Sequence, residues 1–178
     1  MISLFDLGWN EFFENEFRKQ DEGGVCPARV VEELKDAYRV RGETGELLAE
    51  VAGRVRFAAP AREGLPAVGD WVVLAPRERE GRGTILGVLP RRSKVSRKAA
   101  GRAAAEQVIA ANLDTIFVVS SLNRDFNVRR IERYLAMVWE SGASPVVLLT
   151  KADLCEDAAR LRRAEMKSVA IGVPVHVL

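Results

Sequence analysis

The chain has 178 residues, of which 48% are hydrophobic, and its formal net charge is +2. This composition supplies enough apolar surface for one large core or two small ones, which excludes a disordered or fibrous chain. The longest apolar runs are short and the amino terminus is acidic, so the sequence predicts no membrane span, no signal peptide and no membrane partner, and we expect a cytoplasmic protein.

The first half of the chain is typical of an all-β domain behind a short extension. Residues 1–24 are predicted to be an acidic amino-terminal extension, with six acidic and two basic residues. In residues 25–90, short β-branched segments alternate with glycines and prolines, a pattern that predicts a small antiparallel β-barrel. The predicted strands are 28–31, 38–41, 47–51, 55–58, 70–74 and 84–89.

The aromatic residues are mostly interpreted as packing groups. Trp9, Trp71 and Trp139 are expected to anchor cores. An alternative for Trp71, together with Phe57, is that they lie on a barrel face and stack on RNA bases.

The net positive charge is concentrated in a basic connector, residues 91–110. The phosphate backbone of RNA is the expected partner of such a cluster, because each basic side chain can neutralise one phosphate. The alternative is a solvated, mobile linker. The candidate RNA-binding residues are Arg91, Arg92, Lys94, Arg97, Lys98 and Arg102.

In residues 111–178 the periodicity changes to that of an α/β domain. Residues 114–120 and 146–149 are predicted to be buried strands, and 173–178 begins a third. A first helix is predicted on the face formed by Val128, Ile131, Leu135 and Val138, ending at Gly142. A second helix, 156–166, has helical spacing at Leu161 and at Ala164 or Glu165. The order β-α-β-α-β predicts a parallel sheet with right-handed crossovers.

The most informative motif follows the second of these strands, where the tetrapeptide Thr150-Lys151-Ala152-Asp153 begins. Ligands bind at the carboxyl ends of parallel strands. A carboxylate such as that of Asp153 only accepts hydrogen bonds, and guanine offers two adjacent donors where adenine does not. The Lys151 stem can lie along the purine face. The alternative is that Asp153 and Glu156 form a capping box at the start of the next helix and that Lys151 is an ordinary loop lysine.

The sequence contains no phosphate-binding loop of the form G-x-x-x-x-G-K-[S/T]. The segment Asp21-Glu22-Gly23-Gly24 matches the D-x-x-G motif of GTPase switches, but it precedes every predicted parallel strand and is interpreted as a turn. The residues alone therefore predict a base site without a phosphate site.

Several motifs together give a far more specific signal than any one of them. With these motifs the chain resembles, over nearly its whole length, the family of circularly permuted, ribosome-small-subunit-dependent GTPases. The motifs are Leu7-Gly8-Trp9-Asn10, Pro27-Ala28-Arg29-Val30, Val68-Gly69-Asp70-Trp71-Val72, Leu89-Pro90-Arg91-Arg92-Ser93, Ser96-Arg97-Lys98-Ala99-Ala100-Gly101, Ala111-Asn112-Leu113-Asp114 and Leu149-Thr150-Lys151-Ala152-Asp153-Leu154.

The resemblance implies a mixed fold, in which an OB-type barrel is followed by an incomplete, circularly permuted α/β domain of the P-loop GTPase type. The guanine motif then comes first and the P-loop later, so this chain is expected to be truncated before the P-loop. For the full-length protein it implies GTP hydrolysis in late maturation of the small ribosomal subunit, with the barrel and the connector on rRNA. It implies GTP or GDP with Mg²⁺, and Zn²⁺ only in a missing carboxy-terminal domain.

One position departs from the family pattern. The motif usually begins with Asn, whose side chain ties the base loop to the phosphate loop, and Thr150 stands there instead. A threonine hydroxyl donates and accepts but has a shorter reach, so the departure affects this tie more than base recognition.

We expect a monomer, and no hydrolysis by these 178 residues alone. Two other hypotheses stay open at this point. The chain could be an RNA-binding OB module with a non-catalytic α/β domain, or a non-enzymatic assembly factor whose α/β half serves as an interaction surface.

Overall fold

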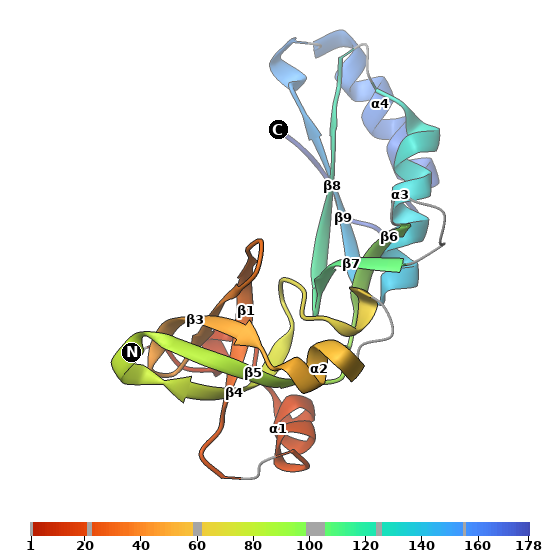
Figure 1. The fold of residues 1–178 in the computed structure, drawn as a ribbon. Coiled ribbons are helices and arrows are strands. Elements are labelled where there is room, and N and C mark those ends of the chain that lie inside the picture. The colour runs from red at the N-terminus through yellow and green to blue at the C-terminus, as the bar shows by residue number, and fades with distance from the viewer. Residues whose placement is uncertain (1, 21–22, 59–61, 99–105, 124–125, 155) are drawn as a thin grey trace. The chain divides into compact units, whose positions relative to one another are not determined.

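The structure of the chain is a computed structural model that describes residues 2–20, 23–58, 62–98, 106–123, 126–154 and 156–178. It divides into two compact units, Met1–Asn112 and Leu113–Leu178, and each is described by itself (Figure 1). The first contains the barrel and the second contains a parallel sheet with two helices. The predicted fold class, an OB-type barrel followed by part of an α/β domain, is confirmed.

The amino-terminal extension forms a 3-10 turn, η1 (Phe5–Leu7), and one helix, α1 (Glu11–Arg18). The Asn10 side chain caps α1 by accepting hydrogen bonds from the amides of Phe12 and Phe13 at 3.0 and 3.4 Å. One face of α1 is buried, because Phe13 and Phe17 pack with Trp9 against Trp71 on the barrel wall. Trp71 is fully buried and therefore anchors a core, as predicted.

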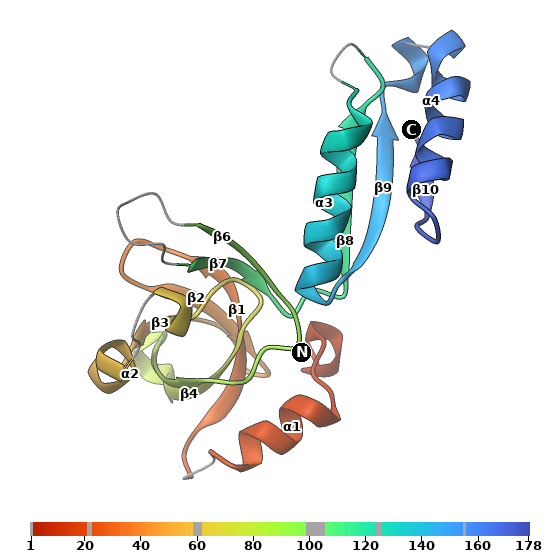
Figure 2. The same ribbon diagram turned by 90° about the vertical axis from the view of Figure 1, so that its right-hand side faces the viewer.

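Five strands close the barrel in the order β1-β2-β3-β5-β4 (Figure 2). Their bounds are β1 (Cys26–Glu33), β2 (Tyr38–Gly42), β3 (Gly45–Val51), β4 (Trp71–Arg77) and β5 (Arg82–Val88). Every pair is antiparallel except β3 and β5, which run parallel and complete the closure. Alternate side chains point inward, so Val30, Val40, Leu74 and Ile85 fill the interior.

The strand predicted at residues 55–58 is wrong. This segment forms a short helix, α2 (Gly53–Ala58). Since β3 already pairs with β5, no sheet edge is left for a strand between β3 and β4, and the chain must cross the barrel end instead. Val55 packs against the barrel core, whereas the side chain of Phe57 is 94% exposed on the helix.

The basic connector contains regular structure. It contributes β6 (Lys94–Lys98), which pairs in antiparallel fashion with β7 (Glu106–Ala111). Two further 3-10 turns, η2 (Arg62–Gly64) and η3 (Glu78–Glu80), lie in the connections around β4. From Lys94 onward, the described part of the connector is therefore a pair of strands.

The second unit contains a three-stranded parallel sheet, as predicted from the β-α-β-α-β pattern, and its strand order is β10-β9-β8. Both helices pack on one face of the sheet, which Figure 1 shows nearly edge-on. Asn127 caps α3 by accepting from the Arg130 amide, and Gly142 ends it in a left-handed conformation. The elements are β8 (Thr115–Ser121), α3 (Val128–Ser141), β9 (Ser144–Thr150), η4 (Ala152–Leu154), α4 (Glu156–Val169) and β10 (Val175–Val177).

Two packing predictions for this unit are wrong. Residues 114–120 are predicted to be a buried strand, but Phe117 and Val119 are about 60% exposed on the face without helices. The helix predicted at residues 156–166 forms as α4, in which Leu161 is exposed and Met166 enters the core. Trp139 is also exposed and anchors no core. The reason in the first case is that α3 and α4 both cover the other face of the sheet.

Candidate functional site

The predicted base loop lies at the carboxyl end of β9, which ends at Thr150. Its backbone is held from both neighbouring strands. The Leu122 amide, just beyond β8, donates to the Thr150 carbonyl at 2.8 Å, and the Ala152 amide donates to the Leu178 carbonyl, just beyond β10, at 3.1 Å. Lys151 has a φ of 62°, a left-handed conformation that turns the chain sharply out of the strand. The loop is thus fixed at the sheet edge where ligands of parallel sheets bind.

The two charged groups of the loop face solvent. Lys151 and Asp153 are exposed, and neither side chain forms a hydrogen bond or ion pair within the described parts of the chain. The capping-box alternative is disfavoured, because Asp153 lies inside η4 and α4 begins only at Glu156. The carboxylate is therefore available to accept two hydrogen bonds from an external donor pair.

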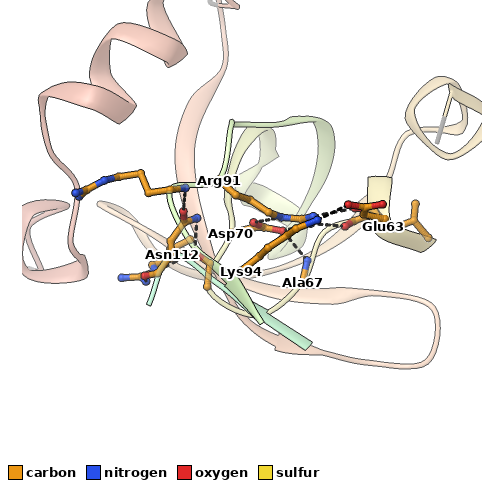
Figure 3. Close-up of polar contacts among 10 residues, drawn as sticks. Glu63, Ala67, Asp70, Arg91, Lys94 and Asn112 are labelled. Carbon is orange, nitrogen blue, oxygen red and sulfur yellow. Dashed lines mark hydrogen bonds and ion pairs between the residues drawn. The ribbon is translucent and has the colours of Figure 1, made fainter. Parts of the chain in front are cut away.

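A second cluster of polar side chains is buried at one end of the barrel, where the chain passes from β5 into the connector (Figure 3). The Arg91 guanidinium forms a two-point ion pair with Asp70, whose carboxylate is fully buried, at 2.9 and 2.7 Å. It also donates to the carbonyls of Glu63 and Leu65 at 2.8 and 2.9 Å. Asp70 accepts a further bond from the Ala67 amide. These contacts occupy the guanidinium of Arg91 inside the protein.

Two residues of this cluster were given no role by the sequence interpretation. Arg29 donates to the carbonyls of Leu7, Gly69 and Asn112, the last two at 3.2 and 2.9 Å. The Asn112 side chain accepts from the Arg92 amide and donates to Gly69, so it ties the connector to the barrel. The available signal was a charged or amide side chain between apolar neighbours, which is expensive to bury unless it is paired.

Gly69 is required where these groups meet. Its φ is +92°, and a Cβ added there would lie 2.0 Å from the Ala111 carbonyl oxygen. The close approach brings the Gly69 carbonyl within reach of both Arg29 and Asn112.

The structure brings part of the predicted RNA-binding set together. Lys94, Arg97 and Lys98 lie on β6, and Arg92 lies two residues before it. Arg92 and Arg97 are exposed, and Lys94 pairs with Glu63. Arg91 stands apart because of its buried pair. Arg102 and the side chain of Lys98 lie outside the described residues, as do Asp21 and Glu22 of the D-x-x-G match.

The outer wall of the barrel is balanced in charge. In OB-folds the face of strands 2 and 3 commonly binds oligonucleotides. Here the arginines on that side are paired with glutamates at hydrogen-bond distance, and the bond to Glu32 raises the pKa of the Arg39 guanidinium. The net positive charge of the first unit is thus carried by the connector rather than by this wall. The pairs are Arg39 with Glu32, Arg41 with Glu46, and Arg82 with Glu50.

None of the helices in the described ranges is long and apolar enough to cross a membrane. Likewise, no three His, Cys, Asp or Glu side chains of those ranges come together as a possible metal site.

Comparison with known proteins gives consistent matches. A family model described as RsgA GTPase matches residues 88–178. The chain is 44% identical to the small ribosomal subunit biogenesis GTPase RsgA of Opitutus terrae, covering 99% of this chain and 50% of that protein. It is 40% identical to the protein of the same name from Syntrophotalea carbinolica, again over 99% of this chain and 50% of the relative. The chain therefore spans about half the length of these relatives.

Two solved structures share the fold. The crystal structure of YjeQ from Thermotoga maritima matches with a TM-score of 0.68 at 21% identity, covering 86% of this chain and 51% of that one. YloQ, described as a circularly permuted GTPase, matches with a TM-score of 0.66 at 20% identity, covering 88% of this chain and 52% of that one.

Proposed function

The chain belongs to the RsgA GTPase family, and we propose that the protein of which it forms about half binds guanine nucleotides through Thr150–Asp153 and hydrolyses GTP. The relatives are named as small ribosomal subunit biogenesis GTPases. We extend that role to this protein as a monomer that acts in the cytoplasm on the small subunit, late in its maturation.

The observation that carries the proposal is the exposed Asp153 carboxylate at the carboxyl edge of the parallel sheet. An ionised carboxylate has only acceptor sites, and guanine places N1–H and the exocyclic amine side by side. Adenine has an unprotonated N1 at the corresponding place, so the same carboxylate would face a second acceptor. Attraction to one base and mismatch with the other together give selectivity.

The neighbouring residues of the loop have supporting roles. The apolar stem of Lys151 can cover one face of the purine while its charge stays near the sugar and phosphates. Thr150 stands where the family has Asn, and its backbone carbonyl is already held by the Leu122 amide. We propose that this backbone contact keeps the loop in place, so that the shorter side chain weakens only the tie to a phosphate loop.

The other half of the full-length protein would complete the enzyme. Because the described residues contain no phosphate cradle, we place the P-loop, the Mg²⁺ site and a zinc-binding domain in that half, and we expect no turnover from these 178 residues. The open face of the parallel sheet supports this division. Its exposed Phe117 and Val119 form an apolar surface of the kind that another part of the fold covers.

We propose that the basic connector contacts rRNA. Arg97 on β6 and Arg92 just before this strand are both exposed, on either side of Lys94 in the sequence. Lys98 and Arg102 belong to the proposed surface by their position in the sequence. Arg91 is left out because its guanidinium is held by Asp70. The barrel would contribute to the rRNA contact through its shape and position more than through charge, since the arginines of its outer wall are paired with glutamates.

Nucleotide titrations test the enzymatic part of the proposal. Full-length protein titrated with fluorescent GDP and ADP should bind the guanine nucleotide at least about tenfold more tightly, because one base forms the paired hydrogen bonds and the other meets an unpaired acceptor. Equal affinities, or no binding of either nucleotide, would favour an RNA-binding OB module with a non-catalytic α/β domain.

A further inference from the structure

Helix α4 has an arginine at a position where its buried face would normally carry an apolar residue. Met166 and Ala170 of this helix region are buried in the core of the second unit. Arg162 lies one turn before Met166, and residues four apart share a helix face. Its neighbours Leu161 and Arg163 are exposed. Arg162 is therefore directed toward the sheet, and its side chain is half-buried.

The guanidinium of Arg162 binds the segment that follows β8. One of its nitrogens donates to the carbonyl oxygens of both Leu122 and Asn123, the latter at 3.1 Å. The guanidinium carbon also lies 5.4 Å from the centre of the Phe126 ring. A planar, permanently charged group with several donors can make both kinds of contact at once, whereas an ammonium group cannot reproduce this geometry.

The segment that follows β8 is hydrogen-bonded directly to the base loop. The amide of Leu122, a fully buried residue, donates to the carbonyl of Thr150 at 2.8 Å. Thr150 is the first residue of the base loop, and α4 begins three residues after Asp153. The contacts therefore close a ring that runs from the base loop through α4 and Arg162 to Leu122, and back to Thr150.

From this ring we infer that Arg162 is a positioning residue for guanine recognition. It touches no nucleotide itself. By binding the carbonyl of Leu122 it restrains the residue whose amide holds the Thr150 carbonyl, and so restricts the directions in which Lys151 and Asp153 project. If a side chain that recognises the base is mobile in the free protein, ligand binding must order it, and this entropic cost lowers both the affinity and the selectivity for the base. The inference rests on the proposed nucleotide site.

Inosine nucleotides give the sharpest test, because they lack the exocyclic amine that guanine offers to Asp153. The GDP-over-IDP affinity ratio of the full-length protein therefore reports how well the Asp153 carboxylate is positioned to accept from the exocyclic amine. We expect Arg162→Gln to lower GDP affinity about threefold to tenfold, equivalent to the loss of one ordinary hydrogen bond, and to lower the GDP-over-IDP ratio as well. The number of binding sites per protein should stay unchanged.

Two matched variants separate this role from general stability. Arg163→Gln removes an exposed neighbouring charge and should bind as the wild type does. Arg162→Lys keeps the charge but loses the two-carbonyl contact, and it should fall between wild type and Arg162→Gln. If Arg162→Gln fails to fold, the GDP-over-IDP affinity ratio of Arg162→Lys tests the inference by itself.

The outcomes distinguish the inference from its premise. A wild-type protein without preference for GDP over IDP and ADP would overturn the proposed function and this inference with it. A wild type that prefers GDP, with Arg162 variants that keep the full GDP-over-IDP ratio, would overturn the inference alone. Fewer binding sites with an unchanged ratio would likewise assign Arg162 to stability only.

Discussion

Arg91 and Asp70 face each other across the barrel end, with two guanidinium nitrogens 2.9 and 2.7 Å from the two carboxylate oxygens. The pair joins the first residue of the connector to the residue that precedes β4. An ion pair of this kind is weak evidence for stability as a whole, but removing one partner leaves the other as an uncompensated buried charge.

Arg91→Ala should therefore destabilise the barrel by about 3–5 kcal/mol. Hydrogen exchange of barrel peptides across a urea series, in the full-length protein, measures this free energy. Arg92→Ala is the control, since Arg92 is exposed and its loss should change stability by no more than about 0.5 kcal/mol. Equal effects of the two substitutions would show that the buried pair is not maintained in solution.

Gly69→Ala should be more damaging than an alanine at a comparable turn. At Gly69 the new Cβ meets the Ala111 carbonyl as well as an unfavourable φ, and we expect a loss of about 2–5 kcal/mol from strain and overpacking together. Gly81, with a φ of +62° and no atom within 4 Å of an added Cβ, isolates the strain at about 1–2 kcal/mol. The same exchange experiment compares the two, and a smaller loss at Gly69 than at Gly81 would contradict the close approach.

How far the sequence could predict the first unit depends on the range of the interactions involved. Alternating apolar residues in β1 and β2 have a local period, so the strands could be placed. The conversion of residues 55–58 into α2 depends on β3 pairing with β5, which is a long-range event that no local pattern records. Likewise, the positive charge of the connector was visible, but the engagement of Arg91 by Asp70 was not.

The second unit shows the same limit. The end of β9 and the base loop could be placed because an apolar run stops abruptly at Thr150. The inward face of α4 could not, because the helix is mostly charged and one of its few large apolar residues, Leu161, is exposed while an arginine faces the sheet.

Helix α4 offers a direct check of that orientation. Met166→Ala should cost about 2–5 kcal/mol because it leaves a cavity in the core, whereas Leu161→Ala should cost less than about 0.5 kcal/mol. Urea-dependent hydrogen exchange of α4 peptides reports both values. A larger effect at Leu161 would mean that the helix is rotated from the position described.

The connector should set the salt dependence of binding to small ribosomal subunits. Each phosphate contact contributes a log-log slope of roughly −0.7 to −0.9, so Arg92→Ala combined with Arg97→Ala should flatten the slope by about 1.4 to 1.8. Arg129→Ala with Arg133→Ala removes the same charge from exposed positions of α3 and serves as the control. An unchanged slope in the connector variant would exclude Arg92 and Arg97 from the contact surface.

Exchanging the Asp153 carboxylate for an amide tests most directly whether this side chain recognises the guanine base. Asp153→Asn presents one acceptor and one donor, which complements the N1–H and the C2 carbonyl of xanthine rather than the two donors of guanine. Titration of full-length Asp153→Asn with fluorescent GDP and XDP should show GDP affinity lowered at least about tenfold and XDP affinity raised above that of the wild type. Unchanged affinities for both nucleotides would show that the Asp153 side chain does not recognise the base.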